Sequence, residues 1–116
     1  MAAAFDLVTI DTPDTARAST FWCAVLDLVV VEDEDHGRWL VLADVDGTRR
    51  IGLQRGPHRP GGTHLDLRCT PAELPDELAR LRQLGATELA PARLEPYGAI
   101  VNLASTSGIR WTGSAQ

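Results

Sequence analysis

Three polar side chains alternate with leucines in the segment His64-Leu65-Asp66-Leu67-Arg68. This alternation predicts a β-strand whose even-numbered residues share one face. On that face the Asp66 carboxylate can orient the His64 imidazole and raise its pKa, which makes the pair a candidate general base. Arg68 adds a guanidinium of the kind that grips a carboxylate or phosphate with two hydrogen bonds. A partly exposed histidine paired with a neighbour, and a salt bridge between Arg68 and Asp66, are the alternatives that the sequence leaves open.

Further candidate ligand-binding residues fall on the same predicted face: Trp39, Gln54, Asn102 and Arg110. Arg110 offers a second anion-binding group, or else forms a salt bridge to an acid such as Asp11 across the sheet. Trp39 is placed either to stack on a flat ligand or to anchor a dimer interface. Because this face is too polar for a dry core and too apolar for plain surface, it predicts a concave pocket for a planar or anionic organic molecule.

The elements that must position these residues occur twice along the chain. Each half begins with an alternating strand that ends in Thr-Pro, at residues 12–13 and 70–71, and this pair predicts a helix start. Thr70 and Glu73 also have the spacing of a capping box, and Gly85 fits the left-handed end of the second helix. Three strand candidates follow each helix: Leu28–Glu32, Arg38–Ala43 and Arg50–Gln54 in the first half, and Ala86–Ala90, Gly98–Ala104 and Ile109–Thr112 in the second.

Both halves therefore read β-α-β-β-β. They give a module at about residues 5–55, a linker at 56–62 that is rich in turn formers, and a second module at about 63–113. A helix must bury its apolar stripe against a sheet, so Val8, Ile10, Leu40 and Leu42 are expected to face the first helix. The opposite face is then left for the pocket.

Composition excludes several classes of function. The chain has 116 residues and a net charge of −5, without a basic stripe, which argues against partners such as nucleic acid and anionic membranes. The spacing of the two cysteines matches no zinc motif. No stretch approaches a membrane span or a signal peptide, so we expect a cytoplasmic protein.

Several segments in a fixed order carry a resemblance to a known family: Asp14, Phe21-Trp22, Leu26–Leu28, Trp39–Gly47, Ile51–Arg55, His64–Leu67 and Leu84–Ala86. Over roughly residues 5 to 113 the chain resembles the short glyoxalase-like domains of the vicinal-oxygen-chelate superfamily, which includes glyoxalases, bleomycin-resistance proteins and extradiol dioxygenases. The resemblance implies an α+β fold of two βαβββ modules that form a U-shaped open barrel with the helices on its outer face. It also implies a homodimer.

Many members of this superfamily bind a divalent metal through residues on the first and last strands of each module. The resemblance places those four positions at Leu7, near Gly52, at His64 and near Thr112. Only His64 is a good metal ligand. We therefore expect no metal and no other cofactor.

The leading interpretation is a metal-independent protein that binds, sequesters or acts on a small organic molecule. One alternative is an isomerase, lyase or cyclase that uses His64 and Asp66 as a base. Less favoured are a metal-dependent lyase or dioxygenase and an assembly module without a ligand. The fold alone does not distinguish among these functions.

Overall fold

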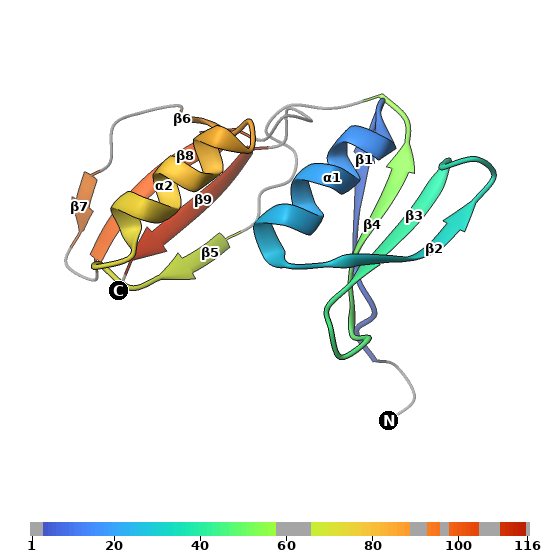
Figure 1. Ribbon diagram of the computed structural model, residues 1–116, viewed down its shortest axis with the longest axis horizontal. Helices are drawn as coiled ribbons and strands as arrows, with labels where there is room; N and C mark the ends of the chain where they lie inside the picture. Colours follow the sequence, from blue (N-terminus) through green and yellow to red (C-terminus); the bar gives the residue numbers. More distant parts are fainter. Residues whose placement is uncertain (1–3, 58–65, 89–92, 96–97, 105–109, 116) are drawn as a thin grey trace. The chain divides into compact units, whose positions relative to one another are not determined.

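The computed structural model describes residues 4–57, 66–88, 93–95, 98–104 and 110–115. The chain divides into two compact units, residues 1–58 and 59–116, and each unit is described by itself. Each contains one helix and one open sheet, which makes the protein α+β as predicted (Figure 1). The barrel shape depends on how the two sheets are arranged and stays a prediction.

The first unit follows the predicted β-α-β-β-β order. Its elements are β1 (Val8–Thr12), α1 (Thr15–Leu26), β2 (Val29–Glu34), β3 (Trp39–Ala43) and β4 (Arg49–Arg55). The strand order is β1-β4-β3-β2, with β1 parallel to β4 and the other pairs antiparallel. Helix α1 contacts β2, β3 and β4 and covers one face of this sheet (Figure 1).

The core of the first unit lies between α1 and the sheet. Trp22 and Leu53 have no exposed surface, and Phe21 meets Trp22 edge to face with ring centroids 5.0 Å apart. Of the residues predicted to face the helix, Ile10, Leu40 and Leu42 are buried and Val8 is half-buried; Ala18, Val25 and Ile51 are buried as well. The alternation of the sequence therefore places the helix-facing side of this sheet correctly.

The start of α1 differs from the prediction by two residues. Thr12 still belongs to β1, where it pairs with Arg55, and its hydroxyl accepts a hydrogen bond from the Asp14 amide. Asp14 is the N-cap instead, and its carboxylate accepts from the Arg17 amide at 3.0 Å. The helix ends at Asp27, which takes the left-handed conformation with φ of 57°.

The second unit repeats the same topology with one addition. Its elements are β5 (Asp66–Cys69), α2 (Leu74–Gln83), β6 (Thr87–Glu88), β7 (Arg93–Glu95), β8 (Gly98–Ala104) and β9 (Arg110–Ala115). The first strand again lies parallel to the last, as β5 pairs with β9, and β8 pairs antiparallel with β9, β6 and β7. The short strand β7 and the last three residues of β9 were not predicted.

The capping box of α2 forms, although the helix begins later than predicted. The Glu73 carboxylate accepts from the Thr70 amide at 3.0 Å, and the Thr70 hydroxyl accepts from the Glu73 amide at 3.3 Å. The Thr70 hydroxyl also donates to the Glu73 carboxylate at 2.7 Å, and the two bonds that this carboxylate accepts, from the Thr70 amide and hydroxyl, lower its pKa. Pro71–Glu73 form a turn, and the helix itself starts at Leu74. Gly85 ends the helix with φ of 109°, as its position in the sequence predicts.

In the described residues no helix is long and apolar enough to cross a membrane.

Candidate functional site

The face of the first sheet that points away from α1 carries the predicted binding residues of the first unit. Strand register places these two, Trp39 and Gln54, in one row with two acidic residues, in the order Asp11, Gln54, Trp39 and Glu34. Three of the four side chains are exposed, and Trp39 is half-buried. We call this surface the Trp39 face and define it by Leu7, Thr9, Asp11, Glu34, Trp39, Val41, Gly52 and Gln54.

The indole of Trp39 lies over Gly52, in the neighbouring strand β4. A Cβ atom built on Gly52 would lie 2.9 Å from Cζ3 of Trp39 and even closer to Cη2. It would also lie 3.0 Å from Cδ1 of Leu7. Real Cβ atoms avoid such contacts, so the ring occupies the space that a side chain at position 52 would need. Leu7, Gly52 and Trp39 therefore form one apolar cluster.

The residues next to this cluster are buried or joined by ion pairs, so they hold the cluster in place. Val41 pairs with Gly52 across β3 and β4, and neither Val41 nor Ala43 has any exposed surface. Beyond them Arg49 bonds to both Asp6, at 2.8 Å, and Glu32. Hydrogen bonds to Glu32 and then Asp6 raise the pKa of Arg49. This guanidinium is thus engaged by two carboxylates.

The positions of the first unit that the family resemblance assigns to metal ligands do not suit a metal ion. Leu7 and Gly52 are indeed neighbours, which supports the assignment of the two positions, but neither side chain can donate an electron pair. The Trp39 ring fills the space between them. Among the residues that the structure describes, no three His, Cys, Asp or Glu side chains gather closely enough to hold a metal.

The predicted site residues of the second unit are placed only by the register of their backbone. Asp66 pairs with Thr112, and Thr112 in turn pairs with Asn102, so these three share one row of the sheet. Arg68 pairs with Ser114, and Arg110 pairs with Ala104. His64 lies outside the described residues. The proposed grouping of His64, Asp66, Arg68 and Arg110 with Trp39 in one pocket stays a prediction.

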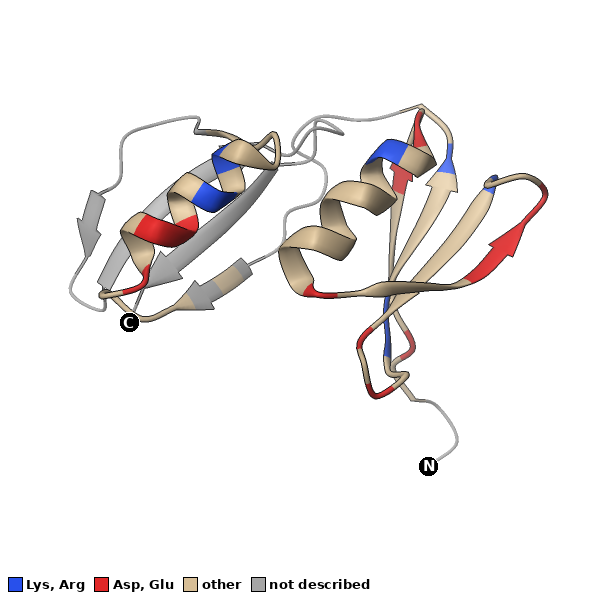
Figure 2. Ribbon diagram, viewed as in Figure 1, with Lys and Arg blue, Asp and Glu red and all other residues tan. Residues whose placement is uncertain are grey.

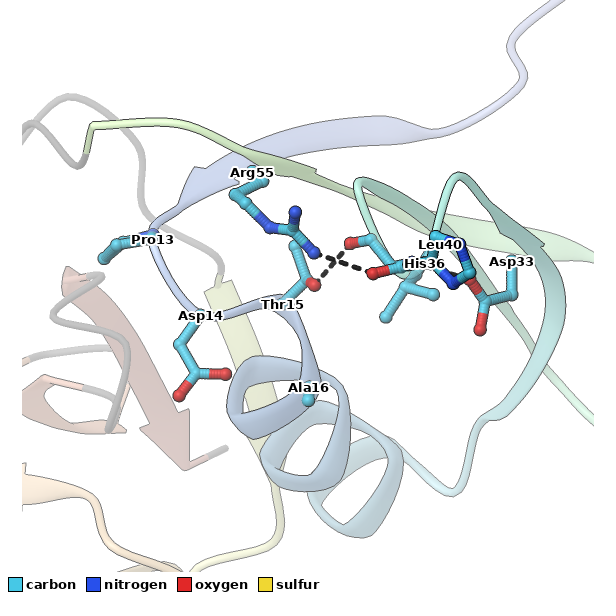
Figure 3. A pocket seen from close by; sticks show the side chains of 9 residues that line it. Pro13, Asp14, Thr15, Ala16, Asp33, His36, Leu40 and Arg55 are labelled. Atoms are coloured by element: carbon cyan, nitrogen blue, oxygen red, sulfur yellow. Dashed lines mark hydrogen bonds between the residues drawn. The ribbon is translucent and has the colours of Figure 1, made fainter.

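A pocket of about 430 Å³ opens elsewhere in the first unit, at the start of α1. Figure 3 shows that its polar groups bond to one another: Arg55 donates to the carbonyl of His36, and the Thr15 hydroxyl donates to that of Gly37. The Asp33 carboxylate accepts from the Gly37 amide. These bonds hold the turn between β2 and β3 against α1 and β4. No residue of the Trp39 face lines this pocket, and we assign it a structural role.

Two features of the Trp39 face were not predicted from the sequence. Gly52 was noted only as a position that lacks a metal ligand, yet a glycine inside a strand is a usual sign of close approach by another group. The predicted strand ends at Glu32 and leaves Glu34 outside it, whereas Glu34 belongs to β2 and pairs with Trp39. Its place in the alternation of that strand is the signal that could have found it.

The open α+β sheets and the paired modules define a protein of the vicinal-oxygen-chelate class. Residues 7–109 match the sequence profile of the glyoxalase-like domain, and the chain belongs to this family. No curated protein sequence matches it.

Solved structures that share the fold differ widely from this chain in sequence. Protein ATC0852 from Agrobacterium tumefaciens has a TM-score of 0.81 at 17% identity, with 97% of each chain covered. The fosfomycin resistance protein FosX from Listeria monocytogenes has a TM-score of 0.79 at 13% identity, over 100% of this chain and 95% of that one. UcmS2 has a TM-score of 0.72 at 22% identity over the whole of both chains. At these identities the likeness shows the fold alone.

Proposed function

We propose that this protein is a metal-independent small-molecule-binding protein of the glyoxalase and bleomycin-resistance type. The observation that carries the proposal is the Trp39 indole lying over Gly52 and beside Leu7. A half-buried aromatic ring with an apolar support beneath it is suited to stack on a flat organic ligand. The ring also stands at the position where a metal-binding relative would carry ligands.

The comparison with a metal-binding neighbour supports the metal-independent form of the proposal. One structure of Listeria monocytogenes FosX is a complex with Mn(II) and dihydroxypropylphosphonic acid. In the present chain both first-unit positions that the resemblance assigns to metal ligands are apolar. A site with so few electron-pair donors would hold a divalent ion weakly. The binding energy of an organic ligand must therefore come from stacking, apolar contact and hydrogen bonds.

A ligand screen by thermal shift tests the proposal, because a molecule that binds the folded state raises its apparent stability. The full chain is screened in parallel with divalent metals and with a chelator, alongside the variant Trp39→Ala. We expect ligands that raise the melting temperature equally in both conditions, and that lose most of the shift in Trp39→Ala. Shifts that appear only with metal would contradict the proposal. So would elemental analysis that finds about one metal ion per chain, lost in His64→Ala.

We also propose that the protein is a homodimer, and an exposed sheet edge supports this. Strand β2 forms one edge of the first sheet, and its residues Val29, Val30 and Val31 are 51%, 45% and 48% exposed. Unpaired edges with apolar side chains are surfaces that proteins commonly cover, and symmetric dimers are the commonest cover.

Sedimentation velocity at micromolar concentration tests the dimer. We expect a dimer for the natural chain, a monomer for Val30→Lys, and a dimer for the control Val45→Lys, because Val45 is 77% exposed in a turn away from that edge. A natural chain that sediments as monomer throughout would contradict the proposal.

A further inference from the structure

The acidic residues of the first unit fall into two groups, according to whether the carboxylate has a hydrogen-bond or ion-pair partner. Most are engaged by a named partner in the structure. These are Asp6 and Glu32 with Arg49, Asp14 with the Arg17 amide, Asp33 with the Gly37 amide, Asp35 with Arg38, and Asp44 with Arg50. Each of these carboxylates therefore stabilises the fold through its bond to another residue.

The side chains of Asp11, Asp27, Glu34 and Asp46 bond to no residue that the structure describes, and of these four only Asp11 and Glu34 lie on the Trp39 face. Both side chains are exposed, and neither has an ion pair or hydrogen bond with any residue that the structure describes. Glu34 pairs directly with Trp39, and Asp11 pairs with Gln54 on the other side of it. Trp39 thus shares a row of the sheet with two carboxylates that nothing described neutralises, while its ring lies over Gly52 in the neighbouring row.

The positive charges of the first unit do not change this balance. Arg49 is held by Asp6 and Glu32, and Arg38 and Arg50 pair with Asp35 and Asp44. Arg55 bonds only the neutral carbonyl of His36, and Arg17 has no ion pair with a described residue, so these two arginines keep their charge. Figure 2 shows acidic residues gathered along β2 and the turn that follows it. Residues 1–58 hold ten aspartates and glutamates against five arginines, so the first unit carries a net negative charge.

From this arrangement we infer that the Trp39 face selects a planar ligand that carries a positive charge, such as a protonated aromatic amine. The indole attracts a cation through the negative face of its ring, and the attraction adds to ordinary stacking. Asp11 and Glu34 supply opposite charge at the two ends of the row, and the Gln54 amide offers a hydrogen-bond acceptor between them. An anionic ring at the same place would meet two carboxylates.

The inference rests on the proposed function and adds the sign of the ligand's charge. It also revises the expectation of an anionic ligand, which came from Arg68 and Arg110 of the second unit. Those side chains are not described, whereas the residues of the Trp39 face are. Adjacent strands lie about 5 Å apart, so a three-ring aromatic system can contact the indole and still reach a carboxylate on either side.

Three dyes that share one ring system test the inference on the full chain. They are proflavine, which is a cation, acridine, which is neutral at mildly alkaline pH, and acridine carboxylate, which is an anion. Binding is measured by calorimetry and by dye fluorescence. We expect proflavine to bind roughly tenfold tighter than acridine, and acridine carboxylate to bind most weakly.

Two double variants separate a local effect from the general attraction of a cation to an acidic protein. Asp11→Asn with Glu34→Gln should lower proflavine affinity roughly tenfold, to the level of acridine. Asp27→Asn with Asp46→Asn removes the same charge at two exposed positions away from the row, and it should change affinity less than about twofold.

Equal effects of the two double variants, or tighter binding of acridine carboxylate than of proflavine, would overturn the inference. So would the failure of all three dyes to bind. If the ligand screen still yields molecules whose binding needs Trp39, the proposed function stands and only the preference for a cation is lost. If it yields none, the proposed function is lost as well.

Discussion

Replacement of Leu53 by alanine is expected to lower the free energy of unfolding of the first unit by about 3 kcal/mol. Leu53 has no exposed surface and pairs with both Ile10 and Leu40, so it sits in the middle of the sheet layer under α1. Truncation removes the transfer energy of its side chain and leaves a cavity that the neighbouring strands cannot close. The effect corresponds to a change of more than a hundredfold in the folding equilibrium.

Urea denaturation followed by near-ultraviolet circular dichroism and tryptophan fluorescence measures this loss, because Trp22 lies in the same core. Val45→Ala is the control, since it shortens an apolar side chain that is 77% exposed. That variant should stay within about 0.5 kcal/mol of the natural chain. A loss at Leu53 of less than about 1 kcal/mol would mean that this layer is not the core described here.

The repeat in the sequence predicted the topology well, because its signals are long and redundant. Alternating strands and helical apolar spacing occur in the same order twice, and each half places its first strand parallel to its last. Short or ambiguous signals failed. Strand β7 has three residues, too few for alternation to be recognised. At the start of α1 both Thr12 and Asp14 are residues that cap helices, and only the pairing of Thr12 with Arg55 decides between them.

The sequence predicted only those features of the candidate site that follow from strand alternation. Alternation put Trp39, Gln54 and Asp11 on the face away from the helix, and the structure confirms this placement in the first unit. It could not reveal that the indole turns toward Gly52, because that depends on the side-chain rotamer and on the space above the neighbouring strand. Nor could it show which acids are neutralised, since Asp6 and Arg49 are far apart in the sequence.

If the Trp39 indole binds ligand as proposed, Gly52 has a part in binding although it has no side chain. The indole can lie against β4 only where no Cβ occupies the space, and every other residue type would place one there. The position of the half-buried ring is therefore set by a glycine on a different strand. If this is correct, a single added methyl group should remove the binding surface without touching the ligand.

Gly52→Ala is accordingly expected to weaken the binding of proflavine, or of any ligand from the screen, by at least roughly tenfold. The added Cβ would meet Trp39 and Leu7 at closer than ordinary contact, so the indole must leave the sheet. Overpacking of this kind should cost about 1–2 kcal/mol of stability, small enough for the chain to stay folded. The indole resonance of Trp39 in nuclear magnetic resonance spectra should shift as the ring moves.

Gly56→Ala is the matched control, because a Cβ at Gly56 would meet nothing within 4 Å. It should bind ligand as the natural chain does. A double-mutant cycle then decides whether Gly52 acts through the ring alone. In a Trp39→Ala background the alanine at position 52 has no indole to displace, so it should have no further effect on affinity. A Gly52→Ala variant that binds like the natural chain, or that still weakens binding once Trp39 is gone, would show that the ligand is held somewhere other than on the indole.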